Sequence, residues 1–406
     1  MTAPILAAAA LCVAAAAIHL ASILIAVVRL RRDAPRESLI GAERPAVSLV
    51  RPLCGIDNYA ADTLASTFAL DYPRCEILFC VASATDPVVP IVETMMAEHP
   101  GNGARLLIGD ERVSSNPKLN NVLKGWHVAR HDWIVLVDSN VLMPRDYIER
   151  LFASWRTDTG LVASPPIGAQ PHGIWAELEC AFLNTYQARW QYVADAFGYG
   201  FAQGKTMLWR RADLERAGGI ETLAKEVAED AASTKIVRGA GLKVRLVDRP
   251  FPQPLGYRSA RDVWHRQLRW ARLRRASFLA CFLPEALAGG ALPIVALAIA
   301  APALDLPPAL SVMVFGLVWY GAETLFAIAV GWHVSARYPL ACVARDFLLP
   351  VLFVGALQGD GFVWRGNEMQ VERLRPRGMI ARVRPRFTEF APVARKRLRS
   401  LRERMS

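Results

Sequence analysis

The sequence predicts an α/β fold, in which a mainly parallel sheet with helices on both faces is joined to membrane segments. Three observations predict it. Short strand-like runs alternate with helical patterns through the middle of the chain, as they do in βαβ units. Apolar stretches long enough to cross a bilayer lie on both sides of that region. Acidic residues follow several strand-like runs, where an open α/β sheet presents ligand groups at its carboxyl edge.

The first apolar stretch is expected to be a membrane anchor at residues 4–29. The 406-residue chain is 53% hydrophobic, and residues 5–28 carry no formal charge. No basic region precedes them and no small-residue cleavage site is evident, which favours a retained anchor over a signal peptide. Arg29, Arg31 and Arg32 follow at once. Because basic residues prefer the cytoplasmic side, the N-terminus is expected outside and the next domain inside.

The middle region, residues 44–275, is expected to form one cytoplasmic domain. Its first half alternates regularly, with strands and helices expected at 47–50, 60–70, 76–82, 87–98, 104–108, 118–129 and 133–137. Its second half is less regular, with elements expected at 160–164, 174–196, 206–209, 224–238 and 242–247. This alternation indicates a mainly parallel sheet with a helix-covered face on each side.

Further membrane segments are expected after this domain. Two apolar spans lie within residues 276–333. A third apolar run, residues 347–357, is too short for a confident crossing. We therefore expect residues 340–362 to be re-entrant or interfacial, because a third full crossing would place the C-terminal tail outside.

The C-terminal tail, residues 364–406, is strongly basic. It holds 13 Arg or Lys against 4 Asp or Glu, which is +9 of the formal net charge of +11. Beside membrane spans such a tail suits anionic lipid headgroups, and this interpretation is favoured over a nucleic-acid-binding arm. A solvated tail that only sets topology stays open. The seven scattered cysteines form no CxxC pair, so reduced thiols are expected rather than disulfides or a zinc site.

Asp138 is the candidate metal ligand. It directly follows the apolar run 133–137, and a carboxylate there can hold a hard divalent cation, Mg²⁺ or Mn²⁺, that bridges phosphate oxygens. The second acid usual in a DxD metal motif is replaced by Asn140. The alternative is that Asp138 only caps a turn or helix.

Asp230 is the candidate general base. It lies with Glu229 in a helical pattern near a glycine-containing loop, and transfer to a hydroxyl with inversion needs one carboxylate to take the proton. Glu229 is a like charge that would raise the pKa of Asp230. The alternative is a solvated acidic face.

Basic residues supply candidate phosphate ligands. Arg266 and Arg269 are three apart on a predicted helix, so they project together and can grip a diphosphate. Trp270 either stacks on a base or sugar or seats the helix at the membrane interface. Lys118 precedes a helix and suits a phosphate, and Gly204 lets backbone approach a ligand. The alternative for the arginines is the positive-inside flank of the next span.

These motifs resemble a known family. VSLVRPLCGID, LDYP, ARLLIGD, NPKLNN, VDSN, GLVASPP, AED and RQLRW occur in that order from about Val47 to Trp270. The set resembles the ceramide glucosyltransferases, glycosyltransferase family 21, within the GT-A group. NPKLNN and the RxxRW form are nearer to this family than to polysaccharide synthases, where QxxRW is usual. The resemblance implies a GT-A-type, Rossmann-like mixed sheet.

The resemblance also implies an activity, the transfer of glucose from UDP-glucose to ceramide, with inversion, at the cytosolic membrane face. A divalent metal, Mg²⁺ or Mn²⁺, is implied as cofactor. In the family pattern Asp86 matches the uridine contact, Asp138 the metal and diphosphate site, Asp230 the base, Lys118 a donor phosphate ligand, and Arg266, Arg269 and Trp270 the RxxRW motif. One departure is that mammalian-type members carry a histidine in the segment matching residues 185–190, which reads TYQARW here.

Alternatives to this activity concern both substrates. Another UDP-sugar, such as UDP-glucuronate or UDP-galactose, or another lipid acceptor, such as a hopanoid or polyprenyl, needs only small changes of the pocket. A processive synthase is disfavoured because it needs more spans, and a scaffold without activity is disfavoured by the intact acids. No nucleic-acid partner is expected. The expected location is the bacterial inner membrane, and the sequence leaves the oligomeric state open.

Overall fold

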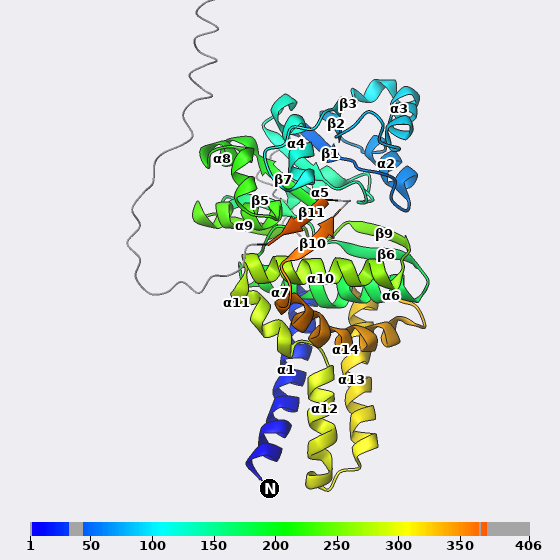
Figure 1. Cartoon of the computed structure of the whole chain (residues 1–406), viewed down its shortest axis with the longest axis vertical. Helices are drawn as coiled ribbons and strands as arrows, with labels where there is room; N and C mark the ends of the chain where they lie inside the picture. Colours follow the sequence, from blue (N-terminus) through cyan, green and yellow to red (C-terminus); the bar gives the residue numbers. More distant parts are fainter. Residues whose placement is uncertain (1, 32–43, 365–366, 372–406) are drawn as a thin grey trace, which may run out of the picture. The chain divides into compact units, whose positions relative to one another are not determined.

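A computed structural model describes residues 2–31, 44–364 and 367–371. The basic tail predicted at residues 364–406 lies almost wholly outside the described residues. The elements are named as in Figure 1, which colours them along the sequence.

The core of the α/β domain is a seven-stranded mixed sheet in the order β3-β2-β1-β4-β7-β5-β8. The strands β3, β2, β1 and β4 are parallel to one another, whereas β7 runs antiparallel to both β4 and β5, and β5 is parallel to β8. The predicted mixed α/β fold is confirmed. The strands are β1 Val47–Pro52, β2 Cys75–Val81, β3 Arg105–Ile108, β4 Trp133–Val137, β5 Thr159–Ala163, β7 Thr206–Arg210 and β8 Lys243–Leu246.

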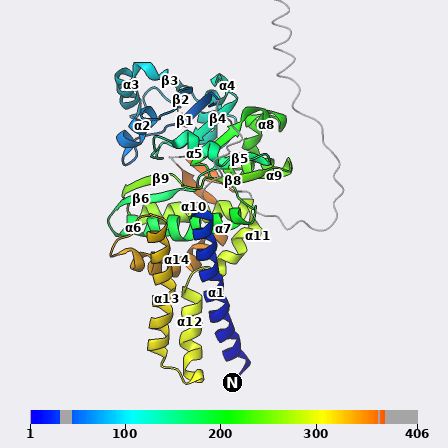
Figure 2. The ribbon, with the colours of Figure 1, turned by 180° about the vertical axis from the view of Figure 1, so that it is seen from behind.

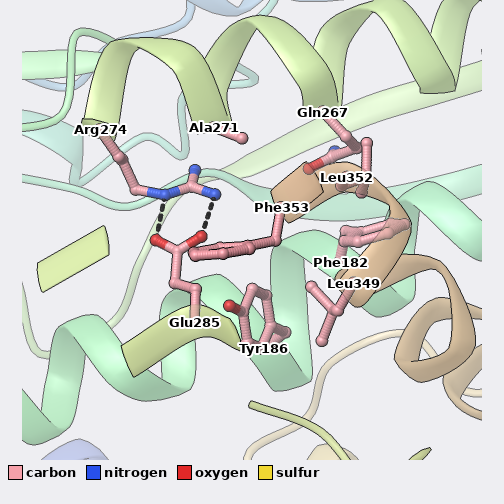
Figure 3. Close-up of a pocket in the computed structure, with 9 residues that line it drawn as sticks. All are labelled: Phe182, Tyr186, Gln267, Ala271, Arg274, Glu285, Leu349, Leu352 and Phe353. Carbon is pink, nitrogen blue, oxygen red and sulfur yellow. Dashed lines mark hydrogen bonds and ion pairs between the residues drawn. The ribbon is translucent and has the colours of Figure 1, made fainter. Parts of the chain in front are cut away.

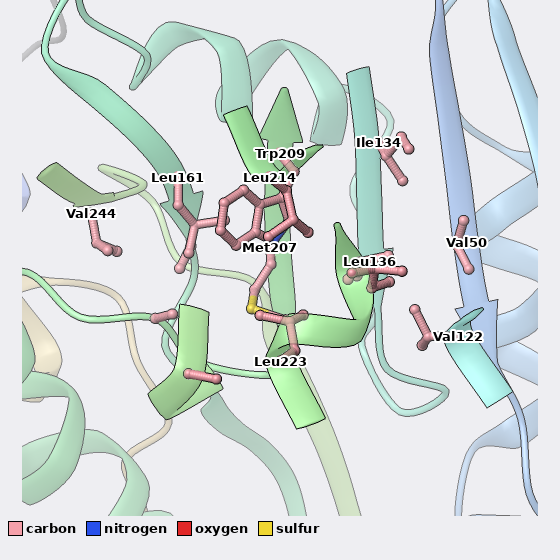
Figure 4. Packing of buried hydrophobic residues seen from close by; sticks show 14 of the residues in the cluster. Val50, Val122, Ile134, Leu136, Leu161, Met207, Trp209, Leu214, Leu223 and Val244 are labelled. Atoms are coloured by element: carbon pink, nitrogen blue, oxygen red, sulfur yellow. The ribbon is translucent and has the colours of Figure 1, made fainter. Parts of the chain in front are cut away.

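Both faces of this sheet are buried, because successive strand residues point to opposite sides and most are apolar. On one face Val50, Ile134, Leu136, Met207 and Trp209 pack in a cluster (Figure 4). The other face has its own apolar cluster. The helices of this domain are α2 Ala60–Phe68, α3 Val89–Glu98, α4 Pro117–Val128, α5 Tyr147–Ala153, α8 Arg211–Arg216 and α9 Glu229–Gly239.

The expected helix at 224–238 is shorter than predicted. Residues Ile220–Lys225 form a 3₁₀ helix, η3, and α9 begins only at Glu229. The acidic pair therefore lies in the first turn of a helix rather than within it. This placement is favourable, because the N-terminal N–H groups and helix dipole attract negative charge.

A second layer connects the sheet domain to the apolar helices. The predicted helix at 174–196 is confirmed as α6 Ile174–Ala181, the π-helix η2 Phe182–Ala188 and α7 Arg189–Ala196. The amphipathic helix α10, Ala260–Ser277, begins at a capping box formed by Ser259 and Asp262. Two further strands, β6 Ile167–His172 and β9 Pro252–Tyr257, pair in parallel.

Four helices in the described part of the chain are long and apolar enough to cross a membrane. They are α1 Ala3–Arg31, the interrupted helix Leu279–Leu304 that contains α12 (Ala291–Ala300), α13 Pro308–Ala329 and α14 Tyr338–Leu357. The helices α1, α12 and α13 contact one another and run side by side away from the sheet (Figures 1 and 2). The protein is therefore a membrane protein.

The last apolar helix extends beyond the apolar run recognised in the sequence. Only residues 347–357 were expected to be apolar, but α14 has 20 residues and is long enough to cross a bilayer. The sequence pattern broke at Arg345 and Asp346, which are fully buried. Arg345 forms ion pairs with Asp346 and with Glu323 of α13. The helix lies crosswise to α12 and α13 in both views (Figures 1 and 2), and an interfacial placement stays a prediction.

Candidate active site

Loops after three parallel strands meet at the carboxyl edge of the sheet. The loop after β1 forms hydrogen bonds with residues of the loops after β2 and β4. The Gly55 N–H lies 3.0 Å from both carboxylate oxygens of Asp86, which follows β2. The carboxylate of Asp57 accepts a 3.0 Å hydrogen bond from the hydroxyl of Ser139, which follows β4. The segments that carry Asp86 and Asp138 are therefore tied to one short loop, as expected for neighbouring parallel strands.

Asp138 is held between two lysines. Its Oδ1 lies 2.6 Å from Lys118 Nζ and its Oδ2 lies 2.8 Å from Lys205 Nζ. Lys205 also donates to Asn140 Oδ1 at 2.9 Å. Burial alone would raise the pKa of Asp138, but the two ammonium groups outweigh it and the pKa is lowered far below its usual range. Asp138 is therefore an anion at every physiological pH.

Lys118 joins the sheet edge to α9. The side chain of Asn116 caps α4 by accepting from the Lys118 and Leu119 N–H groups, which fixes Lys118 in the first turn. Its Nζ contacts Asp138, the Gly204 carbonyl oxygen and, at 2.8 Å, Glu229 Oε1. Burial lowers the pKa of Lys118, but Asp138 and Glu229 raise it to well above the usual lysine value.

The acidic pair faces Gly204. The Gly204 N–H donates to Asp230 Oδ2 at 3.1 Å, and the Ala231 N–H donates to Oδ1 at 2.8 Å. Burial, and then the charge of Glu229, raise the pKa of Asp230 to about 6, although Lys118 and both N–H groups oppose the shift. The predicted influence of Glu229 on the pKa of Asp230 is thus present, and burial is the larger cause.

Gly204 lies close to the ends of two charged side chains. A Cβ atom at this position would lie 2.7 Å from Glu229 Oε1 and 2.9 Å from Lys118 Nζ. The near neighbours of Gly204 are thus charged side chains of the site, and the predicted approach of its backbone to a ligand stays a prediction.

Lys205 was missed by the sequence analysis. Burial lowers the pKa of Lys205, Asp138 opposes this, and the charge of Arg266 lowers it further. Arg266 of α10 therefore lies near the lysine pair. A usable signal was present, because Lys205 directly follows Gly204 at the start of a strand.

The RQLRW segment lies on α10, as predicted, but its residues have different surroundings. Arg266 forms a 2.7 Å ion pair with the fully buried Glu179 of α6. Trp270 packs against an apolar cluster that includes Cys180 and Trp319. These contacts favour the alternative in which Trp270 positions α10 beside the apolar helices over the one in which it stacks on a base or sugar. Arg269 is half-buried on the same helix.

The structure thus brings Lys118, Asp138 and Asp230 into one charged cluster with Glu229 and Lys205. Arg266 is adjacent to it, and Asp86 is tied to it through the loop after β1. Trp270 contacts a different part of the molecule.

The donor atoms at Asp138 suit a hard cation only in part. No group of three His, Cys, Asp or Glu side chains within the described ranges is placed to hold a metal ion. Carboxylate and amide oxygens such as those of Asp138 and Asn140 are hard ligands, and Mg²⁺ is commonly bound by one or two carboxylates together with substrate phosphates. Lysine ammonium groups contact these oxygens in the structure, so the residues fit a metal only when a bound diphosphate completes its ligands and draws the lysines away.

Comparison with solved structures shows which fold the domain has. A mannosyltransferase from Pyrobaculum calidifontis, solved with GDP-Man and Mn²⁺, aligns with a TM-score of 0.51 and 16% sequence identity, over 86% of this chain and 97% of that one. This similarity shows the fold, which is that of a GT-A-like glycosyltransferase.

The family follows from sequence. The family model "Glycosyl transferase family 21" matches residues 7–375, and the chain belongs to that family. Ceramide glucosyltransferase 1 of Caenorhabditis elegans is 24% identical over 350 residues, which are 80% of this chain and 72% of the relative. The ceramide glucosyltransferase of Komagataella phaffii is 38% identical over 99 residues, or 23% of this chain and 19% of that one. The family resemblance seen in the motifs is confirmed.

Proposed function

We propose that this protein transfers glucose from UDP-glucose to the primary hydroxyl of ceramide, with inversion, at the cytosolic face of a membrane. Membership of family 21 and the relatives named ceramide glucosyltransferases support it. The observation that carries the proposal is a part-buried carboxylate, Asp230, with a pKa raised to about 6, in the same cluster as a pair of lysines.

Asp230 has the properties of a general base. A base is most effective when its pKa lies near the working pH, and a pKa of about 6 leaves Asp230 largely ionised at pH 7 while making it more basic than an ordinary aspartate. Asp230 takes the proton of the acceptor hydroxyl while the hydroxyl oxygen forms its bond to the anomeric carbon of the sugar. The bond from that carbon to the diphosphate breaks on the opposite face, and UDP leaves.

The cations of the site suit the leaving diphosphate. Negative charge develops on the diphosphate as the glycosidic bond breaks, and fixed cations in a site shielded from water stabilise such charge strongly. Lys118, Lys205 and Arg266 supply these cations. The loop that carries Asp86 is assigned to the uridine. A divalent metal held by Asp138 with Asn140 would add Lewis-acid stabilisation of the same diphosphate.

The acceptor is assigned to a lipid because the domain is attached to apolar helices. A membrane lipid keeps its headgroup hydroxyl at the interface, where an enzyme anchored at the same surface meets it. The basic tail would add attraction to anionic lipids.

The test uses the purified full-length chain with UDP-glucose, Mn²⁺ or Mg²⁺, and ceramide. Mass spectrometry should detect one added hexose on ceramide. Asp230→Asn should reduce the rate by about 10²–10⁴-fold, with UDP binding retained. Asp62→Asn is a matched control, because Asp62 is also in the first turn of a helix but is exposed.

Two outcomes would overturn the proposal. If Asp230→Asn keeps the rate of the Asp62→Asn control, the base is another group. If UDP-glucuronate, UDP-galactose or a hopanoid acceptor is used and UDP-glucose with ceramide is not, the substrate assignment is wrong.

A further inference from the structure

An apolar groove lies between α6, α10 and α14, outside the charged cluster. Its volume is about 180 Å³, and apolar side chains from all three helices line it, among them Trp175, Phe182, Val263 and Leu352. A smaller adjoining cavity shares Phe182, Leu352 and Gln267 with it (Figure 3). The groove is smaller than the roughly 300–1,000 Å³ of sites that enclose a whole ligand, so it fits a segment of an apolar chain.

One polar side chain in this lining has an unused hydrogen-bond donor. Gln267 is 3% exposed, and its Oε1 accepts a 2.9 Å hydrogen bond from Gln187 Nε2. The buried Nε2 of Gln267 has no hydrogen-bond partner. Leaving a buried donor unsatisfied costs about 1–3 kcal/mol, and native proteins keep few such groups. This donor therefore indicates a ligand that brings an acceptor oxygen to an otherwise apolar groove.

The local backbone supports a functional reading of this position. Gln187, which orients the Gln267 amide, and Phe182, which lines the groove, both belong to the π-helix η2. Short π segments inside α-helices occur frequently at functional sites. The π-helix therefore positions both Phe182, which lines the groove, and Gln187, whose hydrogen bond orients the Gln267 amide.

The groove is also linked to the donor side of the site. Gln267 directly follows Arg266, which pairs with Glu179 of α6 at 2.7 Å and is assigned to the donor diphosphate. One helix, α10, thus carries both a residue near the charged cluster and the donor in the groove. A third wall comes from α14, which is apolar enough to lie in or across a bilayer.

We propose that this groove binds an apolar chain of the lipid acceptor, and that Gln267 Nε2 donates to the amide carbonyl of that lipid. A carbonyl only accepts, and the free group here only donates, whereas a buried hydroxyl would need an acceptor of its own. The assignment rests on the proposed function, and it makes Gln267 a residue that selects N-acylated lipids and orients their headgroup.

The test compares Gln267→Leu and Gln267→Met with the wild-type protein. Loss of one neutral hydrogen bond should raise the KM for ceramide by about three- to tenfold, with the KM for UDP-glucose unchanged. An acceptor in which the amide carbonyl is reduced to a methylene should bind the wild type weakly and show no further loss in either variant. A change in the KM for UDP-glucose or an equal loss with both acceptors would mean that Gln267 acts only on structure.

A second arm tests the groove without relying on turnover. Leu352→Trp fills the groove, whereas Leu340→Trp adds the same bulk at an exposed position of the same helix. A ceramide carrying a photoreactive diazirine on its acyl chain should label α6, α10 or α14 in wild type and Leu340→Trp, and much less in Leu352→Trp. Labelling elsewhere, or equal labelling in both variants, overturns the proposal.

The two arms also separate this inference from the proposed function. If the protein glycosylates a different lipid, the proposed function fails, yet the labelling still reports on the groove. If ceramide is glucosylated normally by Gln267→Leu and Leu352→Trp, the proposed function stands and this inference fails.

Discussion

Two buried charge clusters in this molecule have similar compositions but different surroundings. The cluster among the apolar helices pairs Arg189 and Arg345 with Glu323 and Asp346, all at most 3% exposed. The cluster at the sheet edge combines two lysines with three acids, and its Lys118, Asp138 and Lys205 side chains keep 10–21% of their surface.

The two clusters differ in how completely their charges are paired and buried, and this difference indicates a structural role for one and a ligand-binding role for the other. In the membrane cluster two cations match two anions, with Thr185 and backbone groups completing the contacts of Arg345. Such a closed network fixes how helices pack. At the sheet edge Gly204 brings no side chain to the cluster, the pKa of Asp230 is raised, and the lysines remain partly exposed to solvent. That cluster can exchange internal partners for a ligand.

The largest effect is expected from a substitution that disrupts the cluster of Arg189, Arg345, Glu323 and Asp346 among the apolar helices. Arg345→Met leaves Glu323 and Asp346 buried without their main partner, and removing one member of a buried ion pair costs about 3–5 kcal/mol. The melting temperature of the detergent-solubilised protein should fall strongly. Arg337→Met, at an exposed position just before α14, should leave it unchanged. Equal melting temperatures would show that the network does not stabilise the fold.

The next effect separates activity from stability at the sheet edge. Lys205→Met removes a cation assigned to the leaving diphosphate, and loss of one such group typically costs about 10²–10³-fold in kcat. Glucosylation rates and melting temperatures should be measured together. Lys235→Met removes a surface ion pair with Glu226 and should alter neither. A fall in melting temperature as large as that of Arg345→Met would make Lys205 a structural residue.

Lys205 also shows where sequence reasoning stopped. The ends of β1, β2 and β4 were predictable because mostly apolar runs end at polar turns, and parallel strands bring their carboxyl ends to one edge. The strand β7 is antiparallel to β4, with Val137 opposite Thr206. Its first residues therefore reach the same edge, and Lys205 meets Asp138. Hydrophobic periodicity gives the face of a strand but not its direction.

The apolar run of the last helix was underestimated for a related reason. Arg345 and Asp346 interrupted the apolar run in the sequence, and their partner Glu323 lies on another helix. Pairing between distant helices is invisible to local hydropathy. By contrast, Asp138 could be proposed because it follows a recognisable strand end, and Lys118 because it lies in a turn before a helix. Asp230 was proposed from its acidic neighbour and a nearby glycine loop, although the helix start was placed too early.

A smaller effect concerns pH. Asp230 must be ionised to accept a proton, and its pKa is raised to about 6. The rate with saturating substrates should therefore fall about tenfold for each pH unit well below that value, and be nearly constant above pH 7. UDP binding, measured in parallel, serves as the control because it does not need the base. A rate that stays flat down to pH 4.5 would exclude Asp230 as a base with this pKa.

The smallest effect probes the glycine that keeps the sheet-edge cluster open. In Gly204→Ala the new methyl group would meet Glu229 Oε1 and Lys118 Nζ within 3 Å. Both atoms end flexible side chains, so they can move aside and stability should change by less than about 1 kcal/mol. Glu229 neighbours the proposed base, Asp230, and Lys118 is assigned to the diphosphate, so the glucosylation rate should fall about three- to tenfold at an unchanged melting temperature. Gly239→Ala, where an added Cβ meets nothing within 4 Å, is the matched control. If Gly204→Ala instead melts early and keeps its rate per folded molecule, the glycine serves packing, and the openness of this cluster is not what distinguishes it from the one in the membrane.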